Sequence, residues 1–402
     1  MMNQQPPTNA VSLNEFGRRR VRPSVVIADD KPHIRNFVRD ALEDMGFIVE
    51  DGGSDRLVNL TAGRKMDLVM LGLSAGGLTA SRALETLAAT GFDGQIMIFA
   101  PAELPMVEAL YELGESLSLN MLPLLPTPFS DETLRQAVSR LAPQEPVILP
   151  TLDAAQALRA GWLELWYQPK INARSLTIDG AEALIRMRHP TWGIVPPANF
   201  LPDPDDPNFA ELSFFVLSRA AADWQDFAAD HGHIELAVNL PLTYFSDPLA
   251  IESLIMRLPQ HPAFEGLIVE VNSNELASNI ELARSAARQL RYFNIGLSID
   301  DLGADWPFLL EIGDCPFVEI KVDREFVDGV ANDRLKQTTC RSIVELADQL
   351  GARTVAEGVE TRADFVMARE LGFDVIQGFF FGKPMPPRKF ARHTLREPVR
   401  IN

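Results

Sequence analysis

The first 140 residues alternate short apolar runs with stretches whose apolar residues recur at helical spacing. Residues 24–30 (SVVIADD) have the character of a buried parallel strand that ends in two acids. A helical pattern with a terminating glycine follows at residues 31–46. Further strands are expected at residues 47–53, 66–73, 94–100 and 118–124. Strands that alternate with helices in this way predict a doubly wound parallel sheet, with ligands at the carboxyl ends of the strands.

The rest of the chain repeats this alternation, and its strand-like runs end in polar side chains. Seven of these side chains are acids or amides and the eighth is a lysine: Glu182, Asn239, Glu270, Asp300, Asp301, Glu357, Gln377 and Lys321. Any one of them alone is equally well explained as the cap of a helix or turn. In an α/β barrel, however, the ends of successive strands meet at one mouth, so we expect these groups to face one another. Gathered carboxylates repel unless a cation lies among them, and hard oxygen ligands favour Mg²⁺ or Mn²⁺.

A proline-rich segment separates the two regions. Residues 141–153 contain three prolines and no helical period, which is typical of a linker. An α/β barrel takes ~250 residues, so the chain has room for one barrel and one smaller domain. The predicted organisation is a flexible tail at 1–22, a doubly wound domain at 23–140, a linker at 141–153, a barrel at 154–392 and a C-terminal tail at 393–402.

Composition restricts the class of partner. The net charge is −18, and an acidic chain is a poor non-specific binder of DNA or RNA polymers, which need clustered lysine and arginine. Cys315 and Cys340 stand in no CxxC pattern, so neither a disulfide framework nor a zinc site is expected. The N-terminus carries no apolar signal-peptide run, and no long apolar stretch occurs elsewhere. We therefore expect a cytoplasmic protein with no membrane segment.

Short motifs in the barrel region follow one another in a recognisable order. They are YQPK (167–170), EALIR (182–186), VNL (238–240), IDDLG (299–303), IKVD (320–323), AEGVE (356–360) and QGFFFGKP (377–384). From about residue 152 to about residue 389 the chain resembles the EAL family, whose members hydrolyse the bacterial second messenger cyclic di-GMP. The resemblance implies a TIM-like (β/α) barrel that opens cyclic di-GMP to linear pGpG at a two-metal site holding Mg²⁺ or Mn²⁺.

The same resemblance assigns roles to individual residues. The implied metal ligands are Glu182, Asn239, Glu270, Asp300 and Asp301. The implied catalytic residues, which position water or neutralise charge, are Glu357, Lys321 and Asp301. The implied contacts to the substrate or to its attacking water are Gln168, Arg186 and Gln377. The implied supports behind the ligands are Asp323 and Glu360.

Two departures from the family pattern bear on activity. A second Glu usually follows the acid of Glu270 by three residues and anchors the loop after the two aspartates, but here that position is Ser273. The loop itself carries Ala304 and Asp305 where the family has Thr and Gly. We therefore expect slow or conditional hydrolysis by a homodimer. The alternative is a catalytically inactive cyclic di-GMP receptor that signals through protein partners.

The N-terminal region resembles a response-regulator receiver that has lost its chemistry. Asp29 and Asp30 match the acid pair that holds Mg²⁺ in receivers. The phosphoryl acceptor, however, aligns with Gly72, the switch hydroxyl with Phe99, and the lysine before a cis-type proline with Thr127. Phosphoryl transfer needs a nucleophile and charge stabilisation. The resemblance thus implies a pseudo-receiver used for dimerisation or partner docking. Its acid pair is expected to be a solvated remnant, with weak cation binding as the alternative.

Overall fold

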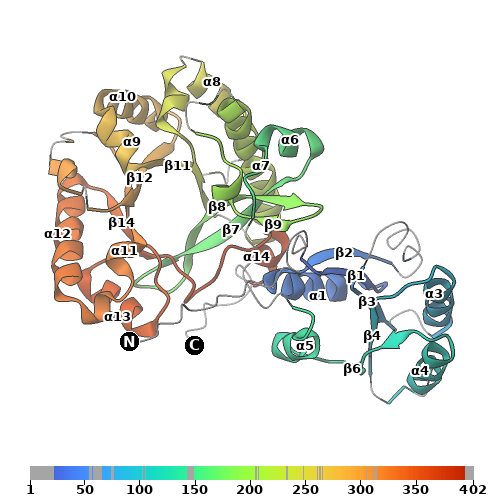
Figure 1. Ribbon diagram of the computed structural model, residues 1–402. Coiled ribbons are helices and arrows are strands. Elements are labelled where there is room, and N and C mark those ends of the chain that lie inside the picture. The colour runs from blue at the N-terminus through green and yellow to red at the C-terminus, as the bar shows by residue number, and fades with distance from the viewer. Residues whose placement is uncertain are drawn as a thin grey trace, which may run out of the picture. The chain divides into compact units, whose positions relative to one another are not determined.

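The structure is a computed structural model (Figure 1). It describes residues 22–53, 57, 66–73, 77–101, 103–104, 106–142, 149–203, 206, 208–231, 234–247, 249–259, 261, 264, 266–304, 306–310, 312 and 315–393. The chain divides into two compact units, one within residues 1–150 together with 189–195, and one within residues 151–188 and 196–402. Within the described ranges, no helix combines the length and the apolar character that crossing a membrane requires.

The N-terminal unit is a parallel sheet covered by helices on both faces. Its strands are β1 (Ser24–Ala28), β2 (Ile48–Gly52), β3 (Leu68–Gly72), β4 (Gln95–Ala100), β5 (Asn120–Met121) and β6 (Leu125–Pro126). They pair in the order β2-β1-β3-β4-β5, with β6 also paired to β4, and every pair is parallel. The helices are α1 (Pro32–Asp44), α3 (Gly77–Ala89), α4 (Met106–Ser116) and α5 (Asp131–Val138). This confirms the doubly wound prediction, although the last expected strand is two short ones.

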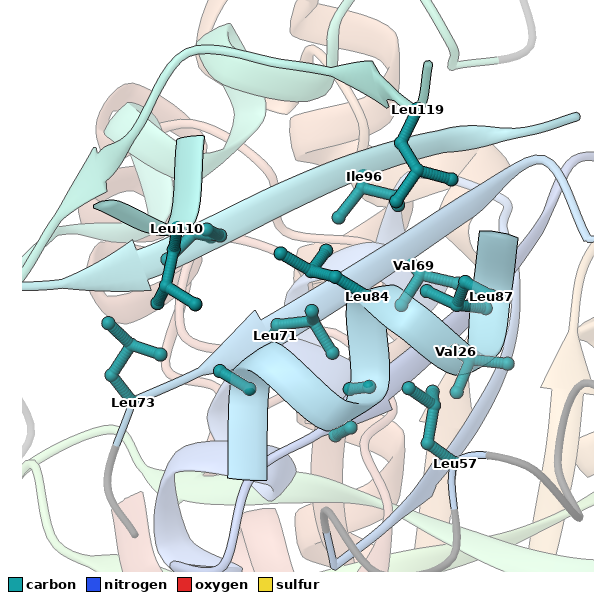
Figure 2. Packing of buried hydrophobic residues seen from close by; sticks show 14 of the residues in the cluster. Val26, Leu57, Val69, Leu71, Leu73, Leu84, Leu87, Ile96, Leu110 and Leu119 are labelled. Atoms are coloured by element: carbon teal, nitrogen blue, oxygen red, sulfur yellow. The ribbon is translucent and has the colours of Figure 1, made fainter. Parts of the chain in front are cut away.

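Alternate residues of these strands build two separate cores. Val26, Val69 and Ile96 pack with Leu84 of α3 and Leu110 of α4 on one face of the sheet (Figure 2). The residues between them along the strands pack against α1 and α5 on the other face. Because successive side chains of a strand point to opposite faces, a continuous apolar run fills both layers at once.

The second unit is a closed barrel of eight strands. They are β7 (Leu163–Asn172), β8 (Ile178–His189), β10 (Glu235–Asn239), β11 (Leu267–Asn272), β12 (Ile295–Leu302), β13 (Glu319–Val322), β14 (Arg353–Ala356) and β15 (Val375–Ile376). Pairing runs from β10 through β15 to β7 and β8, and β8 closes the ring by pairing with β10. The short strand β9 (Gly193–Val195) pairs with β8 outside the ring.

Helices cover the outside of this barrel. They are α6 (Ala154–Ala160), α7 (Asn208–His231), α8 (Ala250–Ile255), α9 (Ser273–Ser278), α10 (Ile280–Arg291), α11 (Arg324–Val327), α12 (Arg334–Leu350), α13 (Arg362–Leu371) and α14 (Pro387–His393). The long α12 and α13 illustrate how local sequence bounds a helix. Asp333 and Thr361 cap their N-termini, and Gly351 and Gly372 end them in the left-handed conformation.

One strand departs from the parallel barrel. β7 pairs antiparallel with both β8 and β15, while the remaining ring pairs are parallel. Only residues 173–177 join β7 to β8. That connection is too short for the crossover that parallel neighbours require, so β8 must turn back along β7. Asn172 stabilises the turn by accepting hydrogen bonds from the backbone N–H groups of Arg174 and Ser175.

Candidate metal centre

Strand pairing gathers the predicted polar side chains at one end of the barrel. Asn239 of β10 pairs with Glu270 of β11, and Asp300 of β12 pairs with the residue two beyond Glu270. On the other side of β10, Glu182 of β8 pairs with Ala237, which is two residues before Asn239. Gln168 of β7 pairs directly with Glu182. Apolar alternation determines these pairings, so burying the core also places the acids together.

The acids form two groups that share a member. Oxygen atoms of Glu182, Glu270 and Asp300 lie within 4.8 Å of one another. Oxygen atoms of Asp300, Asp301 and Glu357 do the same. One residue thus belongs to both groups, which is the arrangement that two neighbouring metal ions with a bridging carboxylate require.

A bulge explains how two consecutive aspartates reach the same place. Neighbouring residues of a regular strand point to opposite faces. The β12–β13 register shifts between Ile299 and Leu302, and Asp301 has a left-handed backbone with φ 52°. An extra residue at a bulge re-aims the side chains around it. Asp300 and Asp301 can therefore both approach Glu357.

Lys321 lies at the centre of the acids. Its Nζ is 2.7 Å from Asp300 Oδ1 and 2.7 Å from Glu357 Oε1. It is also 3.0 Å from Glu270 Oε2 and 3.4 Å from Glu182 Oε2. Burial lowers the pKa of Lys321, but the four carboxylates more than reverse this effect, so that its pKa stands well above the ordinary value. The metal-free site therefore favours the charged form of this side chain.

The carboxylates around Lys321 carry more negative charge than this one lysine balances, and the site is buried. Burial is the largest cause that raises the pKa of Glu270, Asp300 and Glu357. Burial, followed by the charge of Asp300, raises the pKa of Asp301 to about 6. One lysine does not balance this many acids, so added positive charge would stabilise their ionised forms.

The oxygen atoms at this centre indicate what that charge would be. Gln377 Oε1 is buried and accepts no hydrogen bond, and Asp300 Oδ1 is held by Lys321 at 2.7 Å. Asn239 donates through Nδ2 to Glu182 Oε1 at 2.8 Å. Rotating that amide by half a turn would present its oxygen instead. Together these hard oxygen donors fit a divalent cation of the Mg²⁺ or Mn²⁺ type.

The predicted substrate residues divide into two sets. Gln377 donates to Glu182 Oε2 at 2.6 Å and to Gln168 Oε1 at 3.3 Å, so both amides lie beside the acids. Arg186 is half-buried four residues further along β8, where it donates to the carbonyl of Ile185 at 2.8 Å. Burial lowers the pKa of Arg186, and Glu182 partly offsets that effect. A cavity of about 400 Å³ opens onto the acids and is not lined by Arg186.

The two predicted supports lie at the rim of the barrel mouth. Asp323 caps α11 by accepting a hydrogen bond from the backbone N–H of Glu325 at 2.6 Å. Glu360 forms an ion pair at 3.4 Å with Arg324, the first residue of that helix. They are therefore connected through the start of α11.

Comparison with known proteins agrees with this geometry. The model of the EAL domain matches residues 152–384, which is more than half of the chain. The chain belongs to the EAL domain family.

Two relatives of this EAL protein come from Pseudomonas aeruginosa. The cyclic di-GMP phosphodiesterase RocR is 28% identical over 381 residues, which cover 91% of this chain and 97% of RocR. The bifunctional diguanylate cyclase/cyclic di-GMP phosphodiesterase MucR is 34% identical over 239 residues, which cover 58% of this chain and 35% of MucR. The solved cyclic di-GMP complex of the PaMucR phosphodiesterase superposes with a TM-score of 0.54 at 33% identity, covering 59% of this chain and 97% of that one. The RocR match is long enough to include much of the receiver-like N-terminal unit.

Ser273 stands at the position where the EAL pattern has its anchoring glutamate, and its side chain forms a hydrogen bond. Ser273 is fully buried, and its hydroxyl donates to the backbone carbonyl of Asp301 at 3.0 Å. Asn272 donates to Asp301 Oδ2 at 3.1 Å. Glu275, the nearby candidate replacement, accepts from the backbone N–H of Leu242 at 2.6 Å and so holds the segment after β10. Asp305 lies outside the described residues.

Three contacting residues were not singled out from the sequence. Lys170 and Glu319 are buried inside the EAL barrel, and Asn272 contacts Asp301. Lys170 and Glu319 both stand at alternate positions to predicted site residues, Gln168 and Lys321. Period-two spacing was therefore a usable signal, because it places each pair on one face of its strand.

The receiver-like site differs from expectation in one respect. Asp30 is exposed, as a solvated remnant should be, but Asp29 is fully buried. Its Oδ1 accepts from the backbone N–H of Lys31 at 2.7 Å, while Oδ2 is buried without a hydrogen bond. A Cβ at Gly72 would lie 1.8 Å from Asp29 Oδ2 and 2.6 Å from Phe99 Cζ. The acid therefore fills the space that the side chain of a phosphoryl acceptor would need.

Proposed function

We propose that this EAL protein hydrolyses cyclic di-GMP to linear pGpG in a metal-dependent reaction, slowly or conditionally, under the control of a non-phosphorylatable pseudo-receiver. The observation that carries the proposal is the pair of acid groups that share Asp300 around Lys321. The likeness to RocR and to the MucR cyclic di-GMP complex supports the choice of substrate. The proposed domain bounds remain 23–140 for the pseudo-receiver and 154–392 for the EAL domain.

The residues that would hold the metal ions follow from the two acid groups. Glu182, Asn239, Glu270 and Asp300 would bind the first ion, and Asp300 and Asp301 would bind the second with Glu357 beside them. Bound Mg²⁺ or Mn²⁺ supplies a water of lowered pKa and neutralises charge on the phosphate oxygens. Overall, hydrolysis would add the oxygen of one water molecule to phosphorus and break the bond to one ribose 3′ oxygen, which leaves as a hydroxyl after taking up a proton.

The chain's own residues then have separate tasks. Lys321 lies among four carboxylates that favour its charged form, so we assign it to stabilising negative charge as it develops on the phosphate. Asp301 and Glu357 are carboxylates that can accept that proton. Gln377 fixes the orientation of Glu182 by donating to its Oε2, and Gln168 accepts a hydrogen bond from Gln377. The phosphate contact proposed for Arg186 requires its side chain to leave the Ile185 carbonyl.

The test is direct. Purified protein is incubated with cyclic di-GMP and Mn²⁺, and linear pGpG is separated by chromatography. Glu182→Ala removes a ligand that also accepts from Asn239 and Gln377, so it should abolish hydrolysis and weaken Mn²⁺ binding. A circular dichroism melt close to that of wild type confirms that the barrel remains folded. Turnover at the wild-type rate in this variant would exclude the assignment.

A second function is favoured by Ser273. The EAL pattern has a carboxylate at this position, and a single hydroxyl gives the Asp301 segment one neutral hydrogen bond where a charged group would give stronger ones. If the second ion is held poorly, nucleotide binding survives better than hydrolysis. The chain would then be a cyclic di-GMP receptor that acts through protein partners, as a homodimer. Binding measured with Ca²⁺, with no product formed in Mn²⁺, would identify this case.

A further inference from the structure

One buried cation of the barrel has no task in the proposed reaction. Lys170 ends the YQPK motif, follows Gln168 by two residues on β7, and is 1% exposed. Its Nζ lies 2.7 Å from Glu270 Oε1 and 2.8 Å from Glu319 Oε1. Moving a lysine into a protein interior costs several kcal/mol unless it is well paired. The two carboxylates explain how the charge is tolerated, but apolar residues would fill the same space at less cost.

The contacts of Glu270 indicate what the lysine does. Glu270 is fully buried, and its two carboxylate oxygens have different partners. Oε1 accepts from Lys170 at 2.7 Å. Oε2 lies 3.0 Å from Lys321 Nζ and 3.4 Å from Asn239 Nδ2, within the first acid group. A carboxylate with one oxygen occupied in this way cannot rotate about its terminal bond without breaking a charge-assisted hydrogen bond.

We propose that Lys170 is a positioning residue that holds Glu270 Oε1 and thereby leaves Oε2 as the single oxygen directed to the first metal ion. This inference rests on the proposed function, because it assigns a task within the same centre. Lys170 does not reach the reacting atoms and acts only through Glu270. Groups that orient a metal ligand from behind commonly change metal affinity by about 10–100-fold.

A role limited to charge balance fits the surroundings less well. Glu319 accepts from Lys170, from Ser298 Oγ at 3.1 Å and from Arg353 Nε at 2.8 Å. Although burial opposes ionisation, Lys170 and Arg353 lower the pKa of Glu319 to about 2, so it is a carboxylate. Lys170 and Glu319 therefore form a neutral pair, and together they add no net charge to the centre. Net charge therefore does not account for the placement of the lysine, whereas the 2.7 Å contact of its Nζ with Glu270 Oε1 allows it to orient that carboxylate.

The experiment compares two variants of the full chain that break the same ion pair. Lys170→Met removes the hydrogen bond to Glu270 and the bond to Glu319. Glu319→Gln weakens the pair with Lys170 but keeps the lysine against Glu270. Each protein is titrated with Mn²⁺ alone, and free Mn²⁺ is read from its electron paramagnetic resonance signal. Thermal melts record how far each variant is destabilised.

The positioning role predicts a difference between the variants. Both should melt at lower temperature, but Lys170→Met should bind Mn²⁺ at least about tenfold more weakly, whereas Glu319→Gln should stay close to wild type. Equal losses in both would show a merely structural role and overturn the inference. Tighter binding by Lys170→Met would show that the lysine acts only as a repelling charge, which also overturns it.

Three further outcomes remain informative. If Lys170→Met does not fold, the double variant Lys170→Met/Glu319→Met replaces the ion pair by apolar side chains, which is often close to neutral for stability. That variant should show the same loss of Mn²⁺ affinity, and wild-type affinity in it overturns the inference. Wild-type protein that binds no Mn²⁺ overturns the proposed function and this inference together. Binding by wild type that Lys170→Met leaves unchanged overturns the inference alone.

Discussion

Replacing Ser273 with alanine removes one hydrogen bond from the backbone of a proposed metal ligand. Ser273 is fully buried, and its hydroxyl donates to the carbonyl of Asp301 at 3.0 Å. Asp301 has φ 52°, a left-handed conformation that costs a non-glycine residue roughly 1–2 kcal/mol. The serine hydroxyl and Asn272 both contact this residue and so help to hold the strained conformation. Ser273→Ala should let it relax.

The magnitude follows from the lost bond. A neutral hydrogen bond contributes about 0.5–1.5 kcal/mol to stability, and leaving a buried carbonyl unsatisfied costs about 1–3 kcal/mol. If about 1–2 kcal/mol of this appears as misplacement of Asp301 in the transition state, kcat falls about 5–30-fold. Cyclic di-GMP affinity measured in Ca²⁺ should change little, because Glu182, Glu270 and Lys321 come from other strands. The free energy of unfolding should fall by about 1 kcal/mol.

Ser278 provides a matched control on the same helix. Its hydroxyl donates to the carbonyl of Asn274 at 2.7 Å on the exposed side of α9. Ser278→Ala removes a serine-to-carbonyl bond of the same kind without touching the centre, so its kcat should equal that of wild type. Both variants are assayed for pGpG formation in Mn²⁺ and for binding in Ca²⁺. Unchanged turnover in Ser273→Ala, or equal slowing in both variants, would refute the reasoning.

Three further predictions follow from the charges and the packing. Because burial and Asp300 raise the pKa of Asp301 from 3.8 to about 6, the metal-free fold binds this proton more tightly than the unfolded chain. The raised pKa of Asp301 therefore stabilises the metal-free fold below pH 3.8, and this stabilisation is lost as pH rises through about 6. The melting temperature of metal-free wild type should fall across that window by an amount that Asp301→Asn does not show. Lys321→Met should cost about 3–5 kcal/mol without metal, since it leaves buried carboxylates unpaired, and Mn²⁺ should raise its melting temperature more than that of wild type. Gly72→Ala should destabilise the N-terminal unit by about 1–3 kcal/mol through its clash with Asp29. After incubation with acetyl phosphate, mass spectrometry should find no added phosphoryl group on wild type or on Gly72→Asp.

Much of the fold could be predicted from the sequence because buried positions recur along the chain with the period of a helix or a strand. The predicted strand at residues 24–30 contains β1 (Ser24–Ala28), and the one at 66–73 contains β3 (Leu68–Gly72). Acids that follow such runs must lie at strand ends, and parallel strand ends converge. That reasoning brings Glu182, Glu270 and Asp300 together, as the structure does, although Glu182 lies inside the long strand β8 and not at its end. Their roles as metal ligands stay predictions.

The features that were not predicted from the sequence depend on how the barrel closes and on local backbone geometry. The direction of β7 follows from the short connection at 173–177, which the search for strand-like runs did not weigh. Lys170 and Glu319 are charges on strands, and only the closed barrel shows that they are buried together. Asp301 reaches the acids because a bulge turns it, and no residue pattern in IDDLG reports a bulge. Asp29 was expected in solvent together with Asp30, as a remnant at a strand end, yet consecutive residues point in opposite directions.

The N-terminal unit constrains how any signal could enter it. Gly72 offers no acceptor, and the side chain of Asp29 occupies the space in which one would stand. Phosphorylation at the receiver acceptor position therefore cannot shift this unit between two states. A noncovalent partner still can, provided that it binds one state more tightly than the other. If the pseudo-receiver controls hydrolysis as proposed, the control is by differential binding, and its extent is limited by that difference in affinity. A partner that raises turnover must then bind more tightly when the barrel is in its active state.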